Sequence, residues 1–233
     1  MGYAHQSPDS GPSLRKFVDI KQPIPVLLVF IACNIFSGTA LSEKLDQEIY
    51  SKFKDEKGTV LVAVNWGRLW GCGKFENAQL EKLGFESGKA TIDSESPGSE
   101  ILLESPSRVF VDNKFVDYGF IVEPGEYYLS EFSVKVAKSS SDVGYHAAGK
   151  DDLVKNGKPE GGMFTVNTGE TVYIGHFFLD CYYEPVPWRF YPDGRDAFEE
   201  YKRDIKKQFP YIDESSIKFR LFKSKYFGHD YEL

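Results

Sequence analysis

The chain has little cysteine, and its cysteines lie far apart. Only three occur in 233 residues, at positions 33, 72 and 181. Neither Cys72 nor Cys181 has a second cysteine or a histidine at the short spacings that bind zinc. The sequence therefore argues against a zinc module and against a small disulfide-rich scaffold. It predicts neither a metal nor a cofactor.

Positive charge is also in short supply. The formal net charge is -7 at pH 7, and no stripe of Lys and Arg with interleaved aromatic residues occurs. Because an acidic surface repels phosphate backbones, the composition excludes nucleic acid as the expected partner.

Catalytic motifs are lacking as well. Neither G-x-S-x-G nor H-E-x-x-H occurs. Gly144–Lys150 has the spacing of a phosphate-binding loop, but Asp151 follows where a Ser or Thr should coordinate magnesium. His176 is in line with Ile174 on one face of an expected strand, which favours a structural role. We therefore predict no catalytic residue.

One uncharged run, Gln22–Ser42, dominates the first part of the chain. Basic residues precede it and mostly acidic residues follow it, an arrangement that leaves the N-terminus in the cytoplasm. Its apolar centre, Ile24–Phe36, has the length of a signal-peptide core, whereas a spanning helix needs about 20 apolar residues. Small residues would allow cleavage after Ala40. We predict that residues 1–42 are a disordered N-terminus followed by a signal peptide or membrane anchor.

Cys33 adds a lipid anchor to these alternatives. The stretch Phe30-Ile31-Ala32-Cys33 resembles a lipoprotein cleavage box, with a small residue before the cysteine, although Phe30 stands where Leu is usual. Cys33 would then carry the lipid. The remaining alternative is a buried helix of a cytosolic protein, and the flanking charges favour export over it.

Export would leave Cys72 and Cys181 as an even pair in an oxidising compartment. We therefore predict a disulfide between them, with two separate buried thiols as the alternative.

Short apolar runs separated by tight turns predict a mainly β (α+β) fold. Such runs recur at roughly ten-residue spacing, which is typical of an antiparallel β-sandwich, here over residues 58–226. A charged helical lead-in is expected at 43–57 and a tail at 227–233. Expected strands include Thr59–Trp66, Tyr118–Val122, Tyr127–Val136 and a hairpin formed by Met163–Asn167 and Thr171–Leu179. Two segments are expected to be irregular, the exposed excursion Lys138–Gly162 and the connector Tyr182–Pro192.

One amphipathic helix is expected near the C-terminus, at 193–209. Phe198, Tyr201, Ile205 and Phe209 recur at steps of three and four residues, with charged residues on the other faces. This stripe predicts a helix packed on the sandwich.

The segment from Trp66 to Gly73 is a glycine-punctuated turn with two tryptophans and an arginine. Trp66, Arg68 and Trp70 could form a ligand surface on which a sugar or organic cation stacks. The other interpretation, that the indoles cap the core, is favoured because Trp is usually well buried.

The middle of the chain resembles a family of small bacterial envelope β-sandwiches, the PEGA-like and carboxypeptidase-regulatory-like domains. The matching residues are Val109, Val111, Asp112, Lys114, Pro124, Gly125 and Tyr127, with a fainter match over Gly169–Gly175. Asn113 replaces the usual Gly. The resemblance implies a non-catalytic envelope module, often part of a lipoprotein, and it assigns no functional residue.

These observations together predict an exported bacterial protein of the cell envelope, periplasmic or anchored to a membrane. We expect a non-catalytic structural or binding module. Its partners would be the membrane, through the N-terminal segment or a lipid, and an envelope protein or glycan. Two alternatives stay open: an exported hydrolase or ligand-processing enzyme with a site near Trp66–Cys72 and His176, and a secreted or surface interaction protein.

Overall fold

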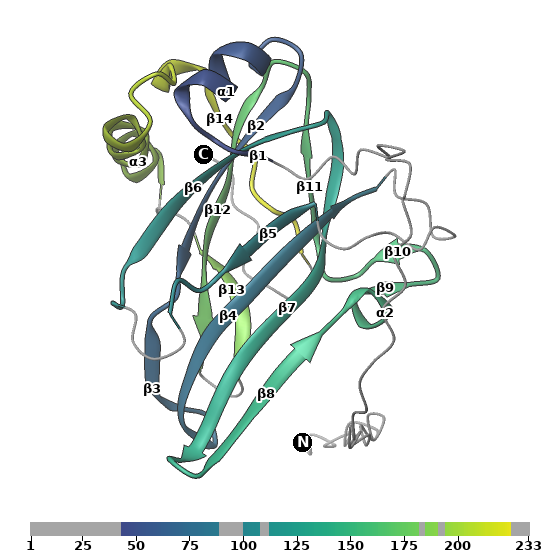
Figure 1. The fold of residues 1–233 in the computed structure, drawn as a ribbon, viewed down its shortest axis with the longest axis vertical. Helices are drawn as coiled ribbons and strands as arrows, with labels where there is room; N and C mark the ends of the chain where they lie inside the picture. The colour runs from purple at the N-terminus through teal and green to yellow at the C-terminus, as the bar shows by residue number, and fades with distance from the viewer. Residues whose placement is uncertain (1–42, 89–99, 108–111, 182–184, 191–193, 225–233) are drawn as a thin grey trace, which may run out of the picture. The chain divides into compact units, whose positions relative to one another are not determined.

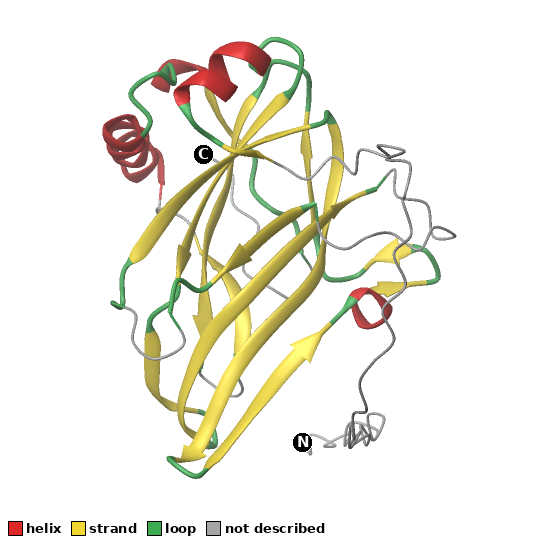
Figure 2. Ribbon diagram, in the orientation of Figure 1, coloured by secondary structure: helices red, strands yellow, loops and turns green. Residues whose placement is uncertain are grey.

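The fold of this protein is mainly β, as the sequence predicts (Figures 1 and 2). A computed structural model describes residues 43–88, 100–107, 112–181, 185–190 and 194–224. Most of the strands in these ranges belong to two six-stranded sheets, which we call sheet A and sheet B.

Sheet A is built around strand β2, which is buried along nearly its whole length. Because both of its faces are covered, the strand is a continuous run of mostly β-branched residues rather than an alternating one. The strand order is β1-β6-β2-β12-β13, and β14 also pairs with β12. The bounds are β1 Glu43–Lys44, β2 Gly58–Asn65, β6 Phe115–Val122, β12 Thr171–Asp180, β13 Val186–Phe190 and β14 Ile217–Phe219.

Sheet B is built around two long strands, β4 and β7, which pair along most of their length. The order is β11-β7-β4-β3, with β5 also paired to β4 and β8 to β7. Figure 1 shows β4, β7 and β8 running side by side. The bounds are β3 Arg68–Cys72, β4 Phe75–Ser87, β5 Ile101–Glu104, β7 Gly125–Ser139, β8 Asp142–Ala148 and β11 Met163–Val166.

Pairing in sheet A differs from the expected antiparallel pattern at its centre. Strand β12 runs parallel to both β2 and β14. A tight turn can join only antiparallel neighbours, whereas strands joined by a long connection can pair in either direction. The chain between β2 and β12 passes through sheet B, so no hairpin dictates their direction.

Side chains of the two sheets share one buried cluster. It includes Val62 and Val64 of sheet A and Leu80 and Phe85 of sheet B. Burial of each such aliphatic or aromatic side chain contributes about 1.5–3 kcal/mol. This common core holds the sheets together.

Helix α3, Gly194–Gln208, carries the expected apolar stripe. Phe198, Tyr201 and Ile205 are buried in a second cluster with Tyr173 of sheet A, on the face of that sheet opposite the common core. Steps of three and four residues place them on one side of the helix, which explains their joint burial.

The remaining helices are short. Helix α1, Gln47–Phe53, lies within the lead-in expected at 43–57, and Asp46 caps it by accepting a hydrogen bond from Ile49 N at 2.8 Å. The others are α2, Lys150–Leu153, and the 3-10 helix η1, Glu214–Ser216; a two-stranded sheet, β9 Val154–Lys155 with β10 Lys158–Pro159, follows α2.

Two segments expected to be irregular contain strands, so that prediction is wrong. The excursion at 138–162 holds β8, α2, β9 and β10, and the connector at 182–192 holds β13. Glycine and small residues mask the alternation of β8, and the Pro and aromatic content of β13 imitates a stiff loop.

The expected hairpin of β11 and β12 is also wrong. Gly169 does take a turn conformation between the two strands, with φ of 70°. However, β11 pairs with β7 in sheet B, while β12 pairs with β2 in sheet A. The turn at Gly169 therefore carries the chain from one sheet to the other.

Candidate ligand-binding face

Large apolar side chains are exposed mainly on one face of sheet B. Among the described residues the exposed ones are Trp70 (66%), Tyr145 (58%), Val143 (46%), Leu102 (43%) and Phe115 (37%). Trp70 and Leu102 each adjoin on their strands a residue that packs in or against the common core, Leu69 and Leu103. Val143 and Tyr145 pair with Ala137 and Lys135 of β7, which alternate with the core residues Val134 and Val136. All four therefore project from the opposite side of sheet B. We call this side, formed by outward residues of β3, β4, β5, β7 and β8, the outer face of sheet B. Single exposed apolar residues are ordinary, whereas their collection on one face marks a candidate interaction site.

The pairing register shows which outer-face residues are neighbours. One row across the sheet consists of Trp70, Asn77, Ala137 and Val143, and the next consists of Arg68, Gln79, Lys135 and Tyr145. Neighbouring strands lie about 4.8 Å apart, so β3 and β8 are separated by about 14 Å. The two exposed aromatic side chains thus stand at opposite edges of the face, in adjacent rows.

Polar contacts order the residues beside Trp70. Gln79 is almost fully buried, and its Nε2 donates to Ser107 O at 3.1 Å and to Ser105 Oγ at 3.4 Å. Arg68 Nη2 in turn donates to Gln79 Oε1 at 3.5 Å. This chain of bonds ties β3, β4 and the segment after β5 together and holds the guanidinium group within its row.

A pocket of about 530 Å³ opens on the same face, next to these rows. It lies over β5, β4, β7 and β8. Its lining consists of Glu81, Lys82, Glu104, Ser105, Glu131, Phe132, Ser133, Ala147, Ala148 and Gly149. Three carboxylates against one ammonium group make the lining acidic. Lys82 Nζ and Glu131 Oε2 form an ion pair of 3.2 Å within it.

Glu81 owes its position to a β-bulge. Leu80 pairs with Val134 and Lys82 with Ser133, so Glu81 is an extra residue without a partner on β7. Its backbone carbonyl accepts from Ser105 N at 2.9 Å. Its Oε1 atom is buried and has no hydrogen-bond partner, a condition it shares among the described residues with Tyr201 Oη. A buried polar group without a hydrogen-bond partner lowers the stability of the fold by about 1–3 kcal/mol, and by more when the group is charged.

The three residues predicted as a ligand surface do not lie together. Trp66 is fully buried in the common core, and its Nε1 donates to Tyr118 Oη at 2.8 Å. Its assignment to a surface is therefore wrong. Arg68 and Trp70 lie on the outer face of sheet B. Within one short segment the two tryptophans thus play opposite roles.

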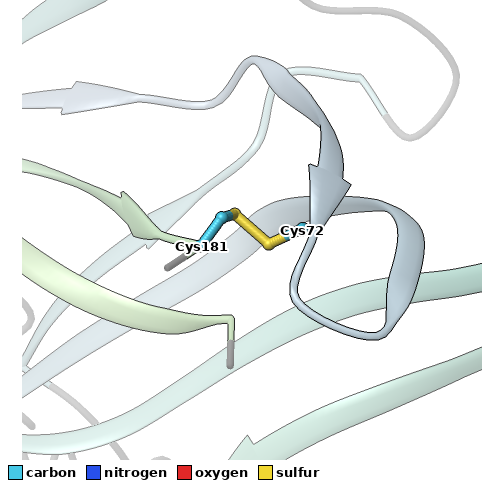
Figure 3. The surroundings of a disulfide bond; sticks show 2 residues. All are labelled: Cys72 and Cys181. Atoms are coloured by element: carbon cyan, nitrogen blue, oxygen red, sulfur yellow. A yellow bond between two sulfur atoms is a disulfide. The ribbon is translucent and has the colours of Figure 1, made fainter. Parts of the chain in front are cut away.

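Cys72 and Cys181 join the two sheets. A disulfide links Cys72, at the end of β3, to Cys181, directly after β12, with an S–S length of 1.97 Å and a Cα–Cα distance of 4.5 Å (Figure 3). Gly73 N also donates to Cys181 O at 3.1 Å. The bond therefore fixes the edge of sheet B that carries Trp70 to sheet A. Cys33 and the rest of the lipoprotein-like box, Phe30-Ile31-Ala32, lie outside the described residues.

The structure does not assemble the enzyme site considered near Trp66–Cys72 and His176. The ring of His176 contacts Tyr201, a residue of the second cluster, whereas Trp66 is buried in the common core. The ring of His176 packs against Phe115 and Tyr201 at centroid distances of 4.5 and 5.3 Å, and its Nδ1 shares a hydrogen bond with Tyr173 Oη. His176 is therefore held as part of an aromatic cluster.

Burial changes the acid–base behaviour of this cluster. Desolvation lowers the pKa of His176 to about 4. Asp117 lies near His176, since both residues pair with Ala63 of β2. Burial, and to a smaller extent the charge of Asp204, raise the pKa of Asp117 to about 6. Burial also raises the pKa of Tyr201 well above its usual value. Near neutral pH the imidazole is thus uncharged.

His146 and the stretch with phosphate-loop spacing, the other candidates for chemistry, are also parts of the scaffold. His146 packs edge-on against Phe75 at 5.3 Å, and no group of three metal-ligating side chains occurs within the described ranges. Gly149 precedes the four-residue helix α2, and the phosphate-loop spacing before it belongs to strand β8.

Some residues that carry the family resemblance are described and others are not. Pro124 and Gly125 lie at the turn between β6 and β7, and Tyr127 is buried on β7. Val109 and Val111 lie outside the described residues.

Sequence reasoning missed Tyr145, Val143 and Glu81. The first two lie in the segment expected to be an excursion, where Val143, Tyr145 and Ala147 alternate with Gly144 and His146. That two-residue period was the available signal. A bulge such as the one at Glu81 leaves no comparable pattern in a single sequence.

Comparison with known proteins leaves the chain without an assigned family. No protein-family model matches it, and no curated protein or solved structure matches it either. Within the described part of the chain, no helix is both long and apolar enough to cross a membrane.

Proposed function

We propose that this protein is a non-catalytic binding module of the bacterial cell envelope, and that its ligand binds to the outer face of sheet B. The observation that carries the proposal is the collection of Trp70, Tyr145, Val143 and Leu102 on that one face. Exposed aromatic side chains next to a polar pocket are a common basis of recognition.

The proposed architecture is a β-sandwich of sheets A and B with helix α3 packed on sheet A. The common core of the two sheets and the joint burial of Phe198, Tyr201 and Ile205 with Tyr173 support it. In this arrangement α3 covers sheet A, and the outer face of sheet B is left for a ligand.

Export is part of the proposal. Its support is the uncharged run Gln22–Ser42 together with the disulfide between Cys72 and Cys181, because such bonds persist in oxidising compartments. The N-terminal segment, or a lipid on Cys33, would hold the protein at the membrane. The resemblance to PEGA-like domains agrees with this location.

The positions of His176 and His146 favour a binding role over catalysis. His176 is packed within the aromatic cluster and His146 packs against Phe75, and neither lines the acidic pocket. A general base must come within hydrogen-bond reach of the reacting group.

The test is sedimentation of the purified full chain with isolated cell envelopes of its source organism. We expect the wild type to sediment. The amount of Trp70→Ala that remains in the supernatant should be at least ten times that of the wild type. Phe115→Ala is the matched control, since Phe115 is an exposed aromatic residue that lies on sheet A. Equal sedimentation of all three proteins would refute the proposed face.

A further inference from the structure

We infer that the ligand of the outer face of sheet B is a neutral polysaccharide chain. This inference rests on the binding role proposed above and adds the chemical class of the ligand. It follows from the aromatic side chains, the distribution of charge and the unsatisfied carboxylate on that face.

The aromatic side chains offer flat apolar surfaces among polar groups. Trp70 and Tyr145 are 66% and 58% exposed, and their two adjacent rows also contain the polar residues Asn77, Arg68 and Lys135. A pyranose ring has the matching character, with apolar C–H faces and hydroxyl groups at its rim. Because the strands that bear Trp70 and Tyr145 are about 14 Å apart, one sugar cannot contact both, and a chain of sugars can.

A protein partner fits this face less well. Protein interfaces have a continuous apolar centre surrounded by a polar rim. Here Asn77, Gln79 and Lys135 stand between Trp70 at one edge and the pair Val143 and Tyr145 at the other, so no apolar centre spans the described part of the face.

The charges on the face favour a ligand without net charge. Arg68 and Lys135 share a row with Tyr145, whereas Glu81, Glu104 and Glu131 line the adjoining pocket. A polyanion would be repelled at the pocket, and a polycation would be repelled at the row. A hydroxyl group both donates and accepts hydrogen bonds, so one polyhydroxylated chain can satisfy both regions.

Glu81 supplies the most specific contact. Its buried Oε1 has no hydrogen-bond partner and belongs to a residue that lines the pocket. An O–H donor to a carboxylate forms a short, strong hydrogen bond. The pocket, at about 530 Å³, is within the usual size range of ligand sites. A sugar hydroxyl that enters it would therefore supply the missing donor.

The bulge provides a variant that tests this contact and keeps the pairing register of β4 with β7. Deletion of Glu81 would bring Leu80 and Lys82 together opposite Val134 and Ser133, which are already consecutive. Leu80 would still face the core and Lys82 would still face outward. The deletion therefore removes the carboxylate and leaves the register of β4 and β7 unchanged. Glu81→Gln is the second variant, with the bulge retained.

The experiment uses the full chain and isolated envelopes treated in three ways. Periodate cleaves the bond between carbons that bear adjacent hydroxyl groups and so destroys most sugar rings, protease removes proteins, and 0.5 M NaCl screens charges. The quantity measured is the Trp70-dependent part of binding, the difference between wild type and Trp70→Ala. We expect periodate to reduce it at least tenfold, and protease and salt to leave it within twofold. Tyr145→Ala, Glu81→Gln and the deletion should each weaken binding at least threefold, whereas Phe115→Ala should not.

Several results would overturn the inference. If protease abolishes binding and periodate does not, the ligand is a protein. If salt abolishes it, the ligand is charged. If both Glu81 variants bind like the wild type, the pocket does not take part. In each case the Trp70 dependence would still support the proposed face, whereas the absence of any Trp70-dependent binding would refute the proposed function itself.

Discussion

Trp66 and Trp70 are four residues apart in the chain, yet Trp66 is fully buried and Trp70 is 66% exposed. We expect Trp66→Ala to lower the free energy of unfolding by about 3–5 kcal/mol, because it leaves a cavity in the common core. Trp70→Ala should change it by about 0.5 kcal/mol or less. Urea unfolding followed by circular dichroism measures both. Similar losses for the two variants would contradict this division of roles.

The disulfide between Cys72 and Cys181 closes a long loop, with a sequence separation of 109 residues. We expect Cys72→Ser/Cys181→Ser to lower the free energy of unfolding by about 2–5 kcal/mol. Guanidinium unfolding with and without reductant measures the effect, and reductant should no longer matter in the double variant. Free, reactive Cys72 and Cys181 in the folded protein, detected by thiol labelling without reductant, would exclude the bond.

His176 and Asp117 should give opposite dependences of stability on pH. The pKa of His176 falls to about 4 on folding, so the unfolded chain binds more protons there between about pH 4 and 6.5, and stability rises with pH in that window. The pKa of Asp117 rises to about 6, so the folded chain holds more protons between about pH 4 and 6, and stability falls with pH there. In the wild type the two effects partly cancel.

Single substitutions separate these two effects. Asp117→Asn retains only the histidine contribution. Between pH 4 and 6.5 its free energy of unfolding should therefore increase by up to about 3 kcal/mol more than that of the wild type. In His176→Gln it should instead fall over the same range. Urea titrations at half-unit pH intervals provide the measurement. Parallel pH profiles for both variants and the wild type would show that neither group titrates in this way.

Gly162 occupies a position that only glycine tolerates. Its φ is +113°, and a Cβ there would lie 2.4 Å from Phe222 Cζ and 2.7 Å from Lys223 O. We expect Gly162→Ala to cost about 1–3 kcal/mol for backbone strain and about 1–3 kcal/mol more for the collision. Gly149→Ala is the control, since its Cβ would meet no atom within 4 Å. Thermal unfolding of both variants measures the difference, and equal melting temperatures would contradict the prediction.

Local patterns in the sequence predicted several helices and strands of the fold. The β-branched run of β2, the alternation in β7 and the apolar stripe at Phe198, Tyr201 and Ile205 each correspond to an element of the structure. These patterns reflect which side chains face the core, and that information is present in a single chain.

The assignment of strands to sheets could not be predicted in the same way. Pairing of β12 with β2, and of β11 with β7, depends on contacts between segments far apart in the sequence. A turn signal such as Gly169 shows that the chain reverses but not which strand it then joins. The separation of Trp66 from Trp70 and the extra residue Glu81 depend on register, which is set by the assembled sheet.

The parallel pairing at the centre of sheet A also bears on how the protein is made. Strands β2 and β12 lie side by side, although β3 to β11 lie between them in the chain. Non-local pairing of this kind folds slowly, because much chain entropy is lost before the contact forms. Thr171–Asp180 must therefore be synthesised before the central pair of sheet A can form, whereas all strands of sheet B are complete by Val166.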